Sequence, residues 1–313
     1  MGRPDPPAAE TPAPTKSSVV IVSYQSAPAL RRCLSALEAS TGREHFEVIV
    51  VDSGSRDETP QVEGEFPKVT FLKLPRNFGL TRARNIGSRT ATGELILYLD
   101  QHVAVQPGTI SGLMRALAEN PDAVAANALL TDPSGNVVTR IYPLPSPAEL
   151  YAIWRRKVWP PARPMPEAAP APVDWIPAQA VMVRAVFLRG MNYFDERYSQ
   201  YWSDLELCFQ IRRSGKKNLL APDVRAVLWP AGEAPLEAAA RGLLSADEAL
   251  GAATYAGKHF GWFAGTRLHI AASFGSLAGL MASVARARDL RYHLSRFGAI
   301  VSAQKVDGSQ NSL

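Results

Sequence analysis

The chain has 313 residues, of which 46% are hydrophobic and 20% charged, and its formal net charge at pH 7 is +5. This composition is typical of a protein with a sizeable buried core, so it excludes a chain that is disordered throughout. Two cysteines, Cys33 and Cys208, are too few for a disulfide framework. We expect both to be buried core residues in a reducing compartment, within one main domain.

Residues 1–17 contain five prolines and no apolar run, which predicts a disordered lead-in that is neither a signal peptide nor a transit sequence. No stretch of about 18 or more residues is strongly apolar and free of polar interruption, so we expect no membrane-spanning helix. The predicted location is cytoplasmic, with the inner face of the plasma membrane as the surface that the protein could visit.

Four apolar runs of strand length come first in the chain, separated by segments that are long enough for helices. Near-continuous apolar strands that alternate with helices are typical of an α/β fold, a mostly parallel sheet sandwiched by helices. Further on we predict a strand, a helix that ends at Gly215, two short strands and an alanine-rich helical region. These elements occupy residues 17–24, 46–52, 69–74 and 93–100, and then 174–184, 203–215, 216–222, 224–229 and 236 onward.

A loop with six prolines spans residues 160–172. Such a composition excludes regular structure, and loops of this length are usually functional or disordered. Trp154, Trp159 and Trp175 surround it, together with basic residues. A flap over a substrate and a disordered insertion with aromatic anchors are both open interpretations.

Polar residues follow three of the apolar runs directly: Ser23, Asp52 and Asp100. Ligands of open α/β sheets bind beyond the carboxyl ends of the strands, so these three side chains are the first candidates for a binding site. A turn or helix-capping role is the alternative for each one alone.

Five blocks of the sequence resemble, in order and spacing, the nucleotide-sugar glycosyltransferases of family 2, over about residues 18–230. The blocks read VVIVSY, VIVVDSGSRDET, NFGLTRARNIG, GELILYLDQHV and FDERYSQYWSDLELCFQIRRSGKK. The resemblance implies the GT-A fold, a Rossmann-like sandwich. It divides residues 18–232 into a nucleotide-binding half at about 18–102 and an acceptor half at about 103–232, and leaves 233–313 as a helical C-terminal extension.

The resemblance also implies a nucleoside-diphosphate sugar donor. It assigns Asp52 to the nucleoside, where a carboxylate can accept hydrogen bonds from a base N–H or a ribose hydroxyl. Ser23 and Tyr24 border the same slot. Arg82 and Arg84 share one predicted helix, where a guanidinium could meet phosphate, and the family pattern favours Arg84.

The family's metal motif, Asp-x-Asp, reads Asp100-Gln101-His102 here, and we expect Asp100 and Gln101 to lie at the donor sugar nucleotide. Asp100 and His102 are the candidate ligands of a divalent cation. Manganese is favoured over magnesium because imidazole suits manganese better. The histidine that the family often has after the last core strand is absent from residues 228–232. A metal-free site, with arginine and backbone N–H groups on the diphosphate, stays the alternative.

Asp204 is the candidate catalytic base, because the family takes the acceptor proton with the aspartate of a Glu-Asp pair that opens a helix. The glutamate of that pair is Ser203 here, and Trp202 and Ser203 are expected on the acceptor side. A capping box from Ser203 to Glu206 is an alternative role for this block. The mechanism that the resemblance implies is a single in-line displacement with inversion, by a hexosyl- or deoxyhexosyltransferase. The expected acceptor is a saccharide or lipid-linked saccharide of bacterial cell-surface polysaccharide or glycoconjugate synthesis.

Residues 264–291 combine an apolar stripe with flanking arginines, as on a helix that lies in a membrane interface. Residues 263–313 carry six Lys or Arg against two Asp or Glu. A helix packed on the catalytic domain, or across a homodimer, is equally compatible. The stripe residues are Ile270, Phe274, Leu277, Met281 and Val284.

Other functional classes fit less well, and no nucleic-acid partner is expected. A nucleotide-dependent dehydrogenase needs a glycine-rich turn after the first strand, but residues 23–28 contain no glycine. A sugar nucleotidyltransferase needs a glycine-rich loop that is also absent. A non-catalytic relative that binds a nucleotide sugar, or a scaffold, remains an alternative because Ser203, His102 and Leu228 depart from the family pattern.

Overall fold

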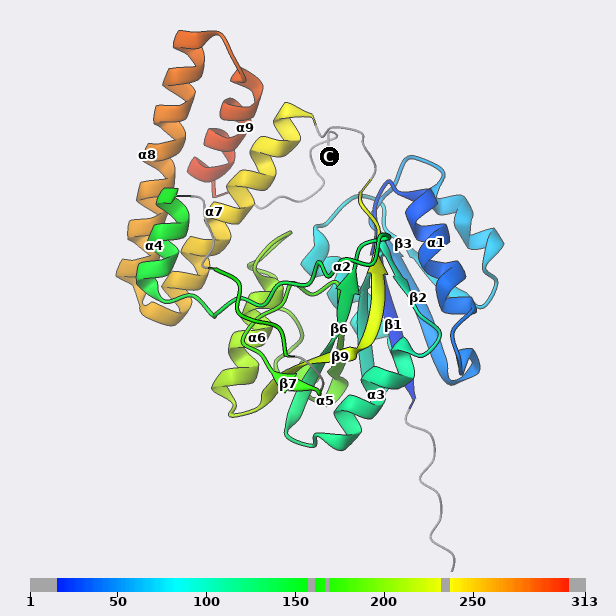
Figure 1. Ribbon diagram of the computed structural model, residues 1–313. Coiled ribbons are helices and arrows are strands. Elements are labelled where there is room, and N and C mark those ends of the chain that lie inside the picture. The colour runs from blue at the N-terminus through cyan, green and yellow to red at the C-terminus, as the bar shows by residue number, and fades with distance from the viewer. Residues whose placement is uncertain (1–15, 157–160, 167–168, 232–236, 304–313) are drawn as a thin grey trace, which may run out of the picture.

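The computed structural model describes residues 16–156, 161–166, 169–231 and 237–303 (Figure 1). Its strands are β1 (Ser17–Ser23), β2 (Phe46–Asp52), β3 (Val69–Lys73), β4 (Leu95–Asp100), β5 (Val103–Val105), β6 (Ala123–Thr131), β7 (Ala171–Pro172), β8 (Ala180–Arg184) and β9 (Lys217–Leu228). Its α-helices are α1 (Ala27–Glu38), α2 (Leu80–Thr90), α3 (Thr109–Glu119), α4 (Pro147–Arg156), α5 (Ala185–Gly190), α6 (Ser203–Arg213), α7 (Ala238–Phe260), α8 (Trp262–Arg286) and α9 (Leu290–Val301). Two 3₁₀ helices are η1 (Arg43–His45) and η2 (Thr59–Glu65).

All these strands form one sheet in the order β3-β2-β1-β4-β8-β6-β9-β5, with β7 paired to β9. The first four predicted strands are β1 to β4, and they are parallel to one another. Strand β8 is antiparallel to both β4 and β6, so the sheet is mixed beyond β4. The predicted class, an α/β sheet sandwiched by helices with a helical C-terminal region, is confirmed.

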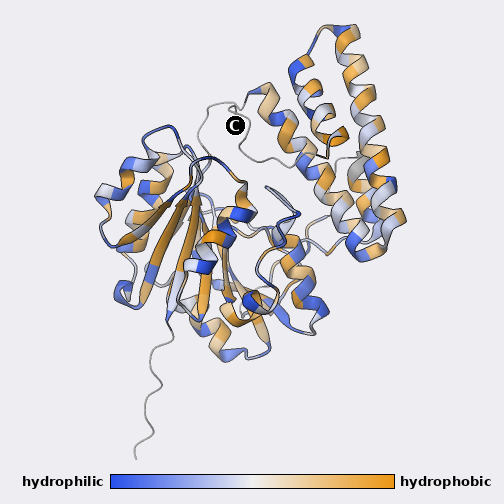
Figure 2. Cartoon of the chain, turned by 180° about the vertical axis from the view of Figure 1, so that it is seen from behind, coloured by the Kyte–Doolittle hydropathy of each residue, from blue (hydrophilic) through white to orange (hydrophobic). Residues whose placement is uncertain are grey.

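Helices cover both faces of the sheet because successive strand residues point to opposite sides. On one face, Val19 and Ile21 pack with Leu34 of α1 and Leu113 of α3. On the other face, Val20 packs in a cluster that includes residues of α5 and α6. Figure 2 shows the strands as the most continuous apolar segments of the molecule. This two-sided burial explains why the strands read as unbroken apolar runs.

Three details differ from the sequence prediction. The connection from β2 to β3 is the 3₁₀ helix η2 rather than an α-helix. The two short strands predicted at 216–222 and 224–229 are the single strand β9, which has an irregularity in its pairing with β6 between Ala221 and Arg225. The strand predicted at 174–184 begins only at Ala180.

Both cysteines are buried and free, as expected for core residues. Burial raises the pKa of each thiol. Residues 1–15, 157–160 and 167–168 lie outside the described residues, so the lead-in and the flap stay predictions. The expectation that the proline-rich loop contains no regular structure is wrong, because its end forms the short strand β7, which pairs with β9. The proposed division at residues 102 and 232 also stays a prediction.

Helices α7, α8 and α9 pack on one another, and α4 lies beside α7 and α8 (Figure 1). The faces that meet are rich in small residues: Gly265 of α8 leaves a Cβ no room against the backbone of Gly257. By length and composition, α8 could cross a membrane, with 22% of its most apolar window buried. The expectation that no segment is apolar enough for this is therefore wrong. The reason is that the polar residues of α8 are mostly small Ser, Thr and Gly, which interrupt the run without making it hydrophilic.

Gly87 of α2 should be sensitive to a single added methyl group. A Cβ at this position would lie 2.5 Å from Cγ1 of Val20 and 3.1 Å from Cγ2 of Val51 in the sheet. We expect Gly87→Ala to lower the free energy of unfolding by about 1–3 kcal/mol in denaturant titrations, because overpacking forces α2 away from the sheet. Gly190→Ala in α5 is the control, since no atom lies within 4 Å of its Cβ. Equal stability of the two variants would contradict this account of the packing.

Candidate active site

The ends of three neighbouring strands bring the first candidate residues together. In the parallel register Ser23 of β1 lies opposite Asp52 of β2, and Val22 lies opposite Asp100 of β4. The backbone N–H of Ser53 donates to the carbonyl of Ser23 at 2.8 Å, which ties the two strand ends together. The structure thus places Ser23, Asp52 and Asp100 at one edge of the sheet, as the sequence predicts.

Asp52 ends β2 and is 2% exposed. Its Oδ1 accepts the backbone N–H of Ser55 at 3.3 Å. Burial raises the pKa of the Asp52 carboxyl above its usual range, and hydrogen bonds from Ser55 offset only part of this rise. A ligand that donates a further hydrogen bond to the carboxylate would therefore stabilise its ionised form.

Gln101 holds the end of β1 through its side-chain amide. Its Oε1 accepts the hydroxyl of Ser23 at 2.7 Å and the backbone N–H of Tyr24 at 3.2 Å. Ser23 is fully buried, while Tyr24 is half-buried and burial raises the pKa of its phenol. Gln101 thus links the strand ends that carry Ser23 and Asp100.

Asp100 and His102 form a tight turn after β4. The backbone N–H of His102 donates to Oδ1 of Asp100 at 2.8 Å. Ring atom Nδ1 of His102 is buried and has no hydrogen-bond partner among the described residues. Trp229, which follows β9, donates its backbone N–H to the carbonyl of His102 at 2.9 Å. The segment where the family often has a histidine therefore lies beside His102, and the guanidinium of Arg32 stacks on Trp229 there.

The metal-binding capacity of this turn is limited to two side chains. Within the described ranges, no group of three or more His, Cys, Asp or Glu side chains could hold a metal ion. An orphaned imidazole nitrogen beside a carboxylate does fit a divalent cation that takes its remaining ligands from a bound substrate.

A cavity of about 460 Å³ opens next to Asp100, between the sheet and α6. It contains five of the sequence-predicted residues and, among the described residues, several that the sequence did not single out. Its lining consists of Leu80, Arg84, Asp100, Tyr142, Trp175, Pro177, Ala178, Gln179, Gln200, Tyr201, Trp202, Ser203, Asp204, Leu205 and Glu248. Ser23, Tyr24, Asp52, Gln101 and His102 do not line this cavity but lie along the adjoining strand ends.

The peptide of Ala178 connects the two charged groups that face each other in the cavity. Nη2 of Arg84 donates to the carbonyl of Ala178 at 2.8 Å, and the N–H of Ala178 donates to Oδ2 of Asp204 at 3.1 Å. The next carbonyl, that of Gln179, accepts the backbone N–H of Asp100 at 2.8 Å. One short segment thus sets the positions of Arg84, Asp100 and Asp204.

Arg84 is 9% exposed and lies against the rings of Tyr98 and Phe194. Burial lowers the pKa of its guanidinium, and the carboxylates of Asp204 and Asp100 oppose this effect. Arg82, two residues earlier, points away and stacks on Phe78. Of the two arginines in this motif, only Arg84 lines the cavity.

Asp204 sits in the first turn of α6, where its Oδ1 also accepts the N–H of Leu205 at 2.8 Å. Trp202 precedes the helix with φ of 74°, a left-handed conformation that is unusual for a bulky residue. The alternative interpretation, a capping box from Ser203 to Glu206, is wrong, because no side chain caps the N-terminus of α6. Glu206 instead turns away from the N-terminus and binds α7 through Lys258 and His259.

Sequence reasoning missed the segment 177–179 and the contribution of α7. The proline in IPAQA is a signal against a central strand, and it could have shown that the strand begins later. No local pattern indicates that Glu248 lines the same cavity as Asp100.

Comparisons with known proteins find similarity to glycosyltransferases. The protein-family model described as "Glycosyl transferase family 2" matches residues 18–164. An N-acetylglucosaminyl-diphospho-decaprenol L-rhamnosyltransferase of Mycobacterium tuberculosis is 29% identical over 224 residues, which are 65% of this chain and 73% of that protein. The pre-mycofactocin glycosyltransferase of the same species is 26% identical over 220 residues, and the match covers 43% of its length.

Solved structures with the same fold include the mannosyltransferase PcManGT from Pyrobaculum calidifontis in complex with GDP-Man and Mn²⁺. It has a TM-score of 0.56 at 17% identity, and the match covers 94% of this chain and 89% of that one. GalNAc-T7 with UDP, GalNAc and Mn²⁺ has a TM-score of 0.54 at 19% identity, covering 70% of this chain and 44% of that one. At these identities the likeness shows the GT-A fold.

The buried Asp52 carboxyl should reduce the stability of the free protein at neutral pH. Because its pKa in the folded state lies above the unfolded value, folding favours the protonated form, and the ionised form costs stability above the folded pKa. We expect Asp52→Asn to raise the melting temperature at pH 7, since the amide oxygen can still accept the N–H of Ser55. The gain should shrink as the pH falls toward the unfolded pKa of the carboxyl. A gain that grows on acidification would contradict the direction of this pKa shift.

Proposed function

We propose that this chain is a sugar-transferring enzyme of glycosyl transferase family 2, in which Asp204, Arg84 and Asp100 surround the reacting groups. The observation that carries this proposal is the shared cavity, in which a carboxylate and a buried guanidinium face each other across the Ala178 peptide. The transfer of a sugar from a nucleoside diphosphate requires a positive charge at the leaving diphosphate and a base at the acceptor hydroxyl. Both groups are present in one space.

The nucleoside half of the donor would bind at the strand ends of β1 and β2. Asp52 can accept a hydrogen bond from a base or ribose, and Ser23 and Tyr24 border that position. The diphosphate would then extend past Gln101 and Asp100 toward Arg84. Arg84 supplies a fixed positive charge for the leaving group, because its guanidinium is already held by the carbonyl of Ala178.

A divalent cation would be held by Asp100 and His102 together with diphosphate oxygens. The orphaned Nδ1 of His102 and the mixed carboxylate-imidazole set support Mn²⁺ rather than Mg²⁺. When bound, the cation neutralises charge that develops on the diphosphate. Two solved structures of the same fold contain Mn²⁺, which supports the cation without deciding the metal.

Asp204 is the proposed base. It would take the proton of the acceptor hydroxyl, whose oxygen then forms a bond to the anomeric carbon as the bond to the diphosphate breaks. This single displacement inverts the anomeric configuration. The backbone N–H donors from Ala178 and Leu205 keep the carboxylate oriented, and the rings of Tyr201 and Trp202 limit water on the acceptor side.

The substrate proposal follows the mycobacterial relative, which is described as an L-rhamnosyltransferase acting on N-acetylglucosaminyl-diphospho-decaprenol. We propose a hexose or deoxyhexose donor, with thymidine-diphosphate rhamnose first, and a lipid-linked saccharide acceptor at the inner face of the plasma membrane. A binding protein without turnover is the second candidate, because Ser203 replaces the family's glutamate. A homodimer remains a prediction.

Asp204→Asn should separate an enzyme from a binder. We expect the variant to lose about 10²–10⁴-fold in transfer rate, because the amide cannot take a proton. Its stabilisation by nucleoside diphosphates in a thermal-shift panel, with and without Mn²⁺, should equal that of the wild type.

Ser203→Ala is the matched control for this test, since Ser203 also lines the cavity but carries no charge at neutral pH. If no nucleoside diphosphate or its sugar stabilises the wild type, the proposed function is wrong. If Asp204→Asn transfers sugar at the wild-type rate, Asp204 is not the base.

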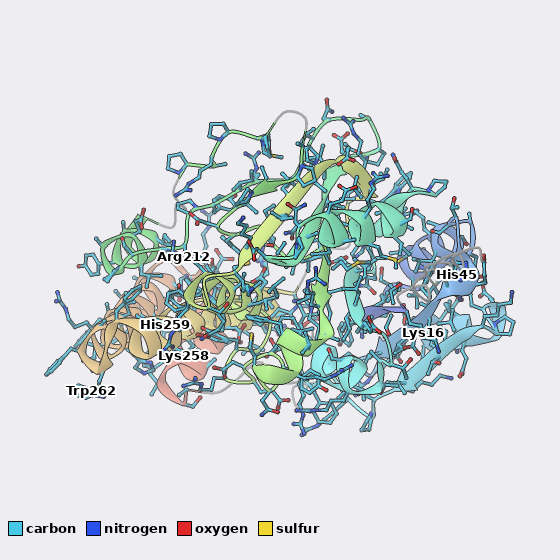
Figure 3. The ribbon with its side chains drawn as sticks, turned by 90° about the horizontal axis from the view of Figure 1, so that it is seen from below. Lys16, His45, Arg212, Lys258, His259 and Trp262 are labelled. Atoms are coloured by element: carbon cyan, nitrogen blue, oxygen red, sulfur yellow. The ribbon has the colours of Figure 1, made fainter. Side chains whose placement is uncertain are left out.

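The apolar stripe of α8 supports contact with a bilayer. Ile270, Phe274, Leu277, Met281 and Val284 are 49%, 69%, 40%, 63% and 61% exposed. Another face of α8 does pack on the catalytic domain, because Leu268 lies in the same apolar cluster as Trp202 and Leu205. Figure 2 shows apolar residues along the outer side of α8, and in Figure 3 Trp262 lies at the outer edge of the helical region.

An anionic bilayer is the occupant that the charges favour. Arginines flank the stripe at Arg267 near its start and at Arg286, Arg288 and Arg291 near its end. Cationic side chains at both ends of an exposed apolar stripe match the boundary between lipid head groups and acyl chains. This orientation would bring a lipid-linked acceptor close to the protein.

Vesicle sedimentation tests the membrane proposal. We expect the wild type to bind vesicles that contain phosphatidylglycerol more tightly than vesicles of phosphatidylcholine alone. The double variant Phe274→Ser, Met281→Ser should bind at least about tenfold more weakly, because each side chain contributes about 1.5–3 kcal/mol on burial. Val186→Ser is the control, since Val186 is 72% exposed on α5, away from the stripe. Equal binding of all three proteins would refute the membrane contact.

A further inference from the structure

Helix α7 contacts the chain on both sides of Asp204. The contacts come from two groups of α7 residues that lie about two to three helical turns apart. One group binds the segment just before α6, and the other binds the first turn of α6. The two groups are Asp247, Glu248 and Gly251, and then Lys258 and His259.

The Asp247 carboxylate holds the backbone that leads into the site. Its Oδ2 accepts the N–H of Gln200 at 2.9 Å and that of Tyr201 at 3.1 Å. Asp247 is only 6% exposed. A buried carboxylate that accepts two neighbouring backbone N–H groups fixes the direction of the chain at this point. Gln200 and Tyr201 both line the 460 Å³ cavity.

The next residue, Trp202, is held by the following turn of α7. Its indole N–H donates to the carbonyl of Glu248 at 2.9 Å. The indole ring also lies on Gly251, where a Cβ would come to 2.9 Å from Cγ and 3.0 Å from Nε1 of Trp202. The left-handed conformation of Trp202 is therefore imposed by contacts with α7, since a bulky side chain does not favour it by itself.

On the other side of Asp204, Glu206 is bound by the end of α7. The Glu206 carboxylate is 2% exposed at its side chain and accepts Nζ of Lys258 at 2.7 Å and Nε2 of His259 at 2.6 Å. Burial alone would raise the pKa of Glu206, but hydrogen bonds from Gln210, His259 and Lys258 bring it below its usual range. Figure 3 shows Lys258 and His259 on α7, beside α6.

We propose that α7 is a positioning element of the active site, with Asp247 and Gly251 as its positioning residues for Trp202 and Asp204. The inference rests on the proposed function, in which Asp204 faces the acceptor. The C-terminal helices then complete the acceptor side of the cavity, in addition to any contact with a membrane. These contacts of α7 do not involve Ser23 or Asp52, which lie at the ends of β1 and β2 where the nucleoside would bind.

The test compares two disruptive variants with two matched controls. Asp247→Leu removes the acceptor of both N–H groups, whereas Asp247→Asn keeps an oxygen that can accept them. Gly251→Ala forces a methyl group against Trp202, whereas Gly257→Ala, on the same helix, brings a Cβ only to ordinary contact at 3.6 Å from Gly265. Rhamnose transfer from thymidine-diphosphate rhamnose to N-acetylglucosaminyl-diphospho-prenol gives kcat and the acceptor KM, and calorimetry gives the affinity for thymidine diphosphate with Mn²⁺.

The expected result is a fall of at least tenfold in kcat over acceptor KM for Asp247→Leu and Gly251→Ala. Affinity for thymidine diphosphate should stay within twofold of the wild type, and both controls should behave as the wild type. Unchanged transfer in the two disruptive variants overturns the proposal. A loss of nucleotide affinity in parallel with transfer also overturns it, because it shows general disruption rather than positioning.

Hydrogen exchange distinguishes this inference from the proposed function. If the wild type shows no transfer and no nucleotide binding, the proposed function fails. Exchange at residues 200–206 still decides whether α7 holds the segment. Exchange at residues 200–206 should be faster in Asp247→Leu and Gly251→Ala, while β1 and β4 stay protected. Unchanged exchange at residues 200–206 would overturn the inference that α7 positions this segment.

Discussion

The site depends on one constraint: the positive charge of a buried guanidinium must be balanced by hydrogen bonds and nearby carboxylates. Only 9% of the surface of Arg84 is exposed, so water solvates its charge poorly. The carbonyl of Ala178 meets the guanidinium, and the N–H of the same residue meets Asp204. Because the carbonyl and the N–H of a single residue meet the two groups, the same short segment holds Arg84 and the proposed base. Charge burial and catalytic geometry are therefore coupled in this cavity.

The antiparallel direction of β8 serves the same geometry. The strand runs antiparallel to β4 and begins at Ala180, directly after Gln179, whose carbonyl accepts the N–H of Asp100. A parallel strand at this position would start at the opposite edge and could not bring Gln179 to Asp100. The mixed sheet is thus part of the construction of the site, and the parallel strands β1 to β4 provide its nucleotide side.

The helical region has two faces with different tasks. Its inner face, through Asp247 and Glu206, is tied to α6 by buried polar contacts. Its outer face exposes the apolar stripe of α8. In the proposed arrangement, a helix pair held at a lipid surface would also hold the acceptor side of the cavity. Donor binding at the strand ends would be independent of that surface.

The sequence by itself determined the parallel strands, because burial on both faces leaves continuous apolar runs, and it placed Ser23, Asp52 and Asp100 at one edge. Asp204 was indicated by its motif at the start of a helix. Only the tertiary structure decided that Glu206 binds α7 instead of capping α6, and that α7 holds Trp202. Local periodicity reports which side of an element is buried, whereas contacts between residues 40 or more positions apart arise only when the chain packs.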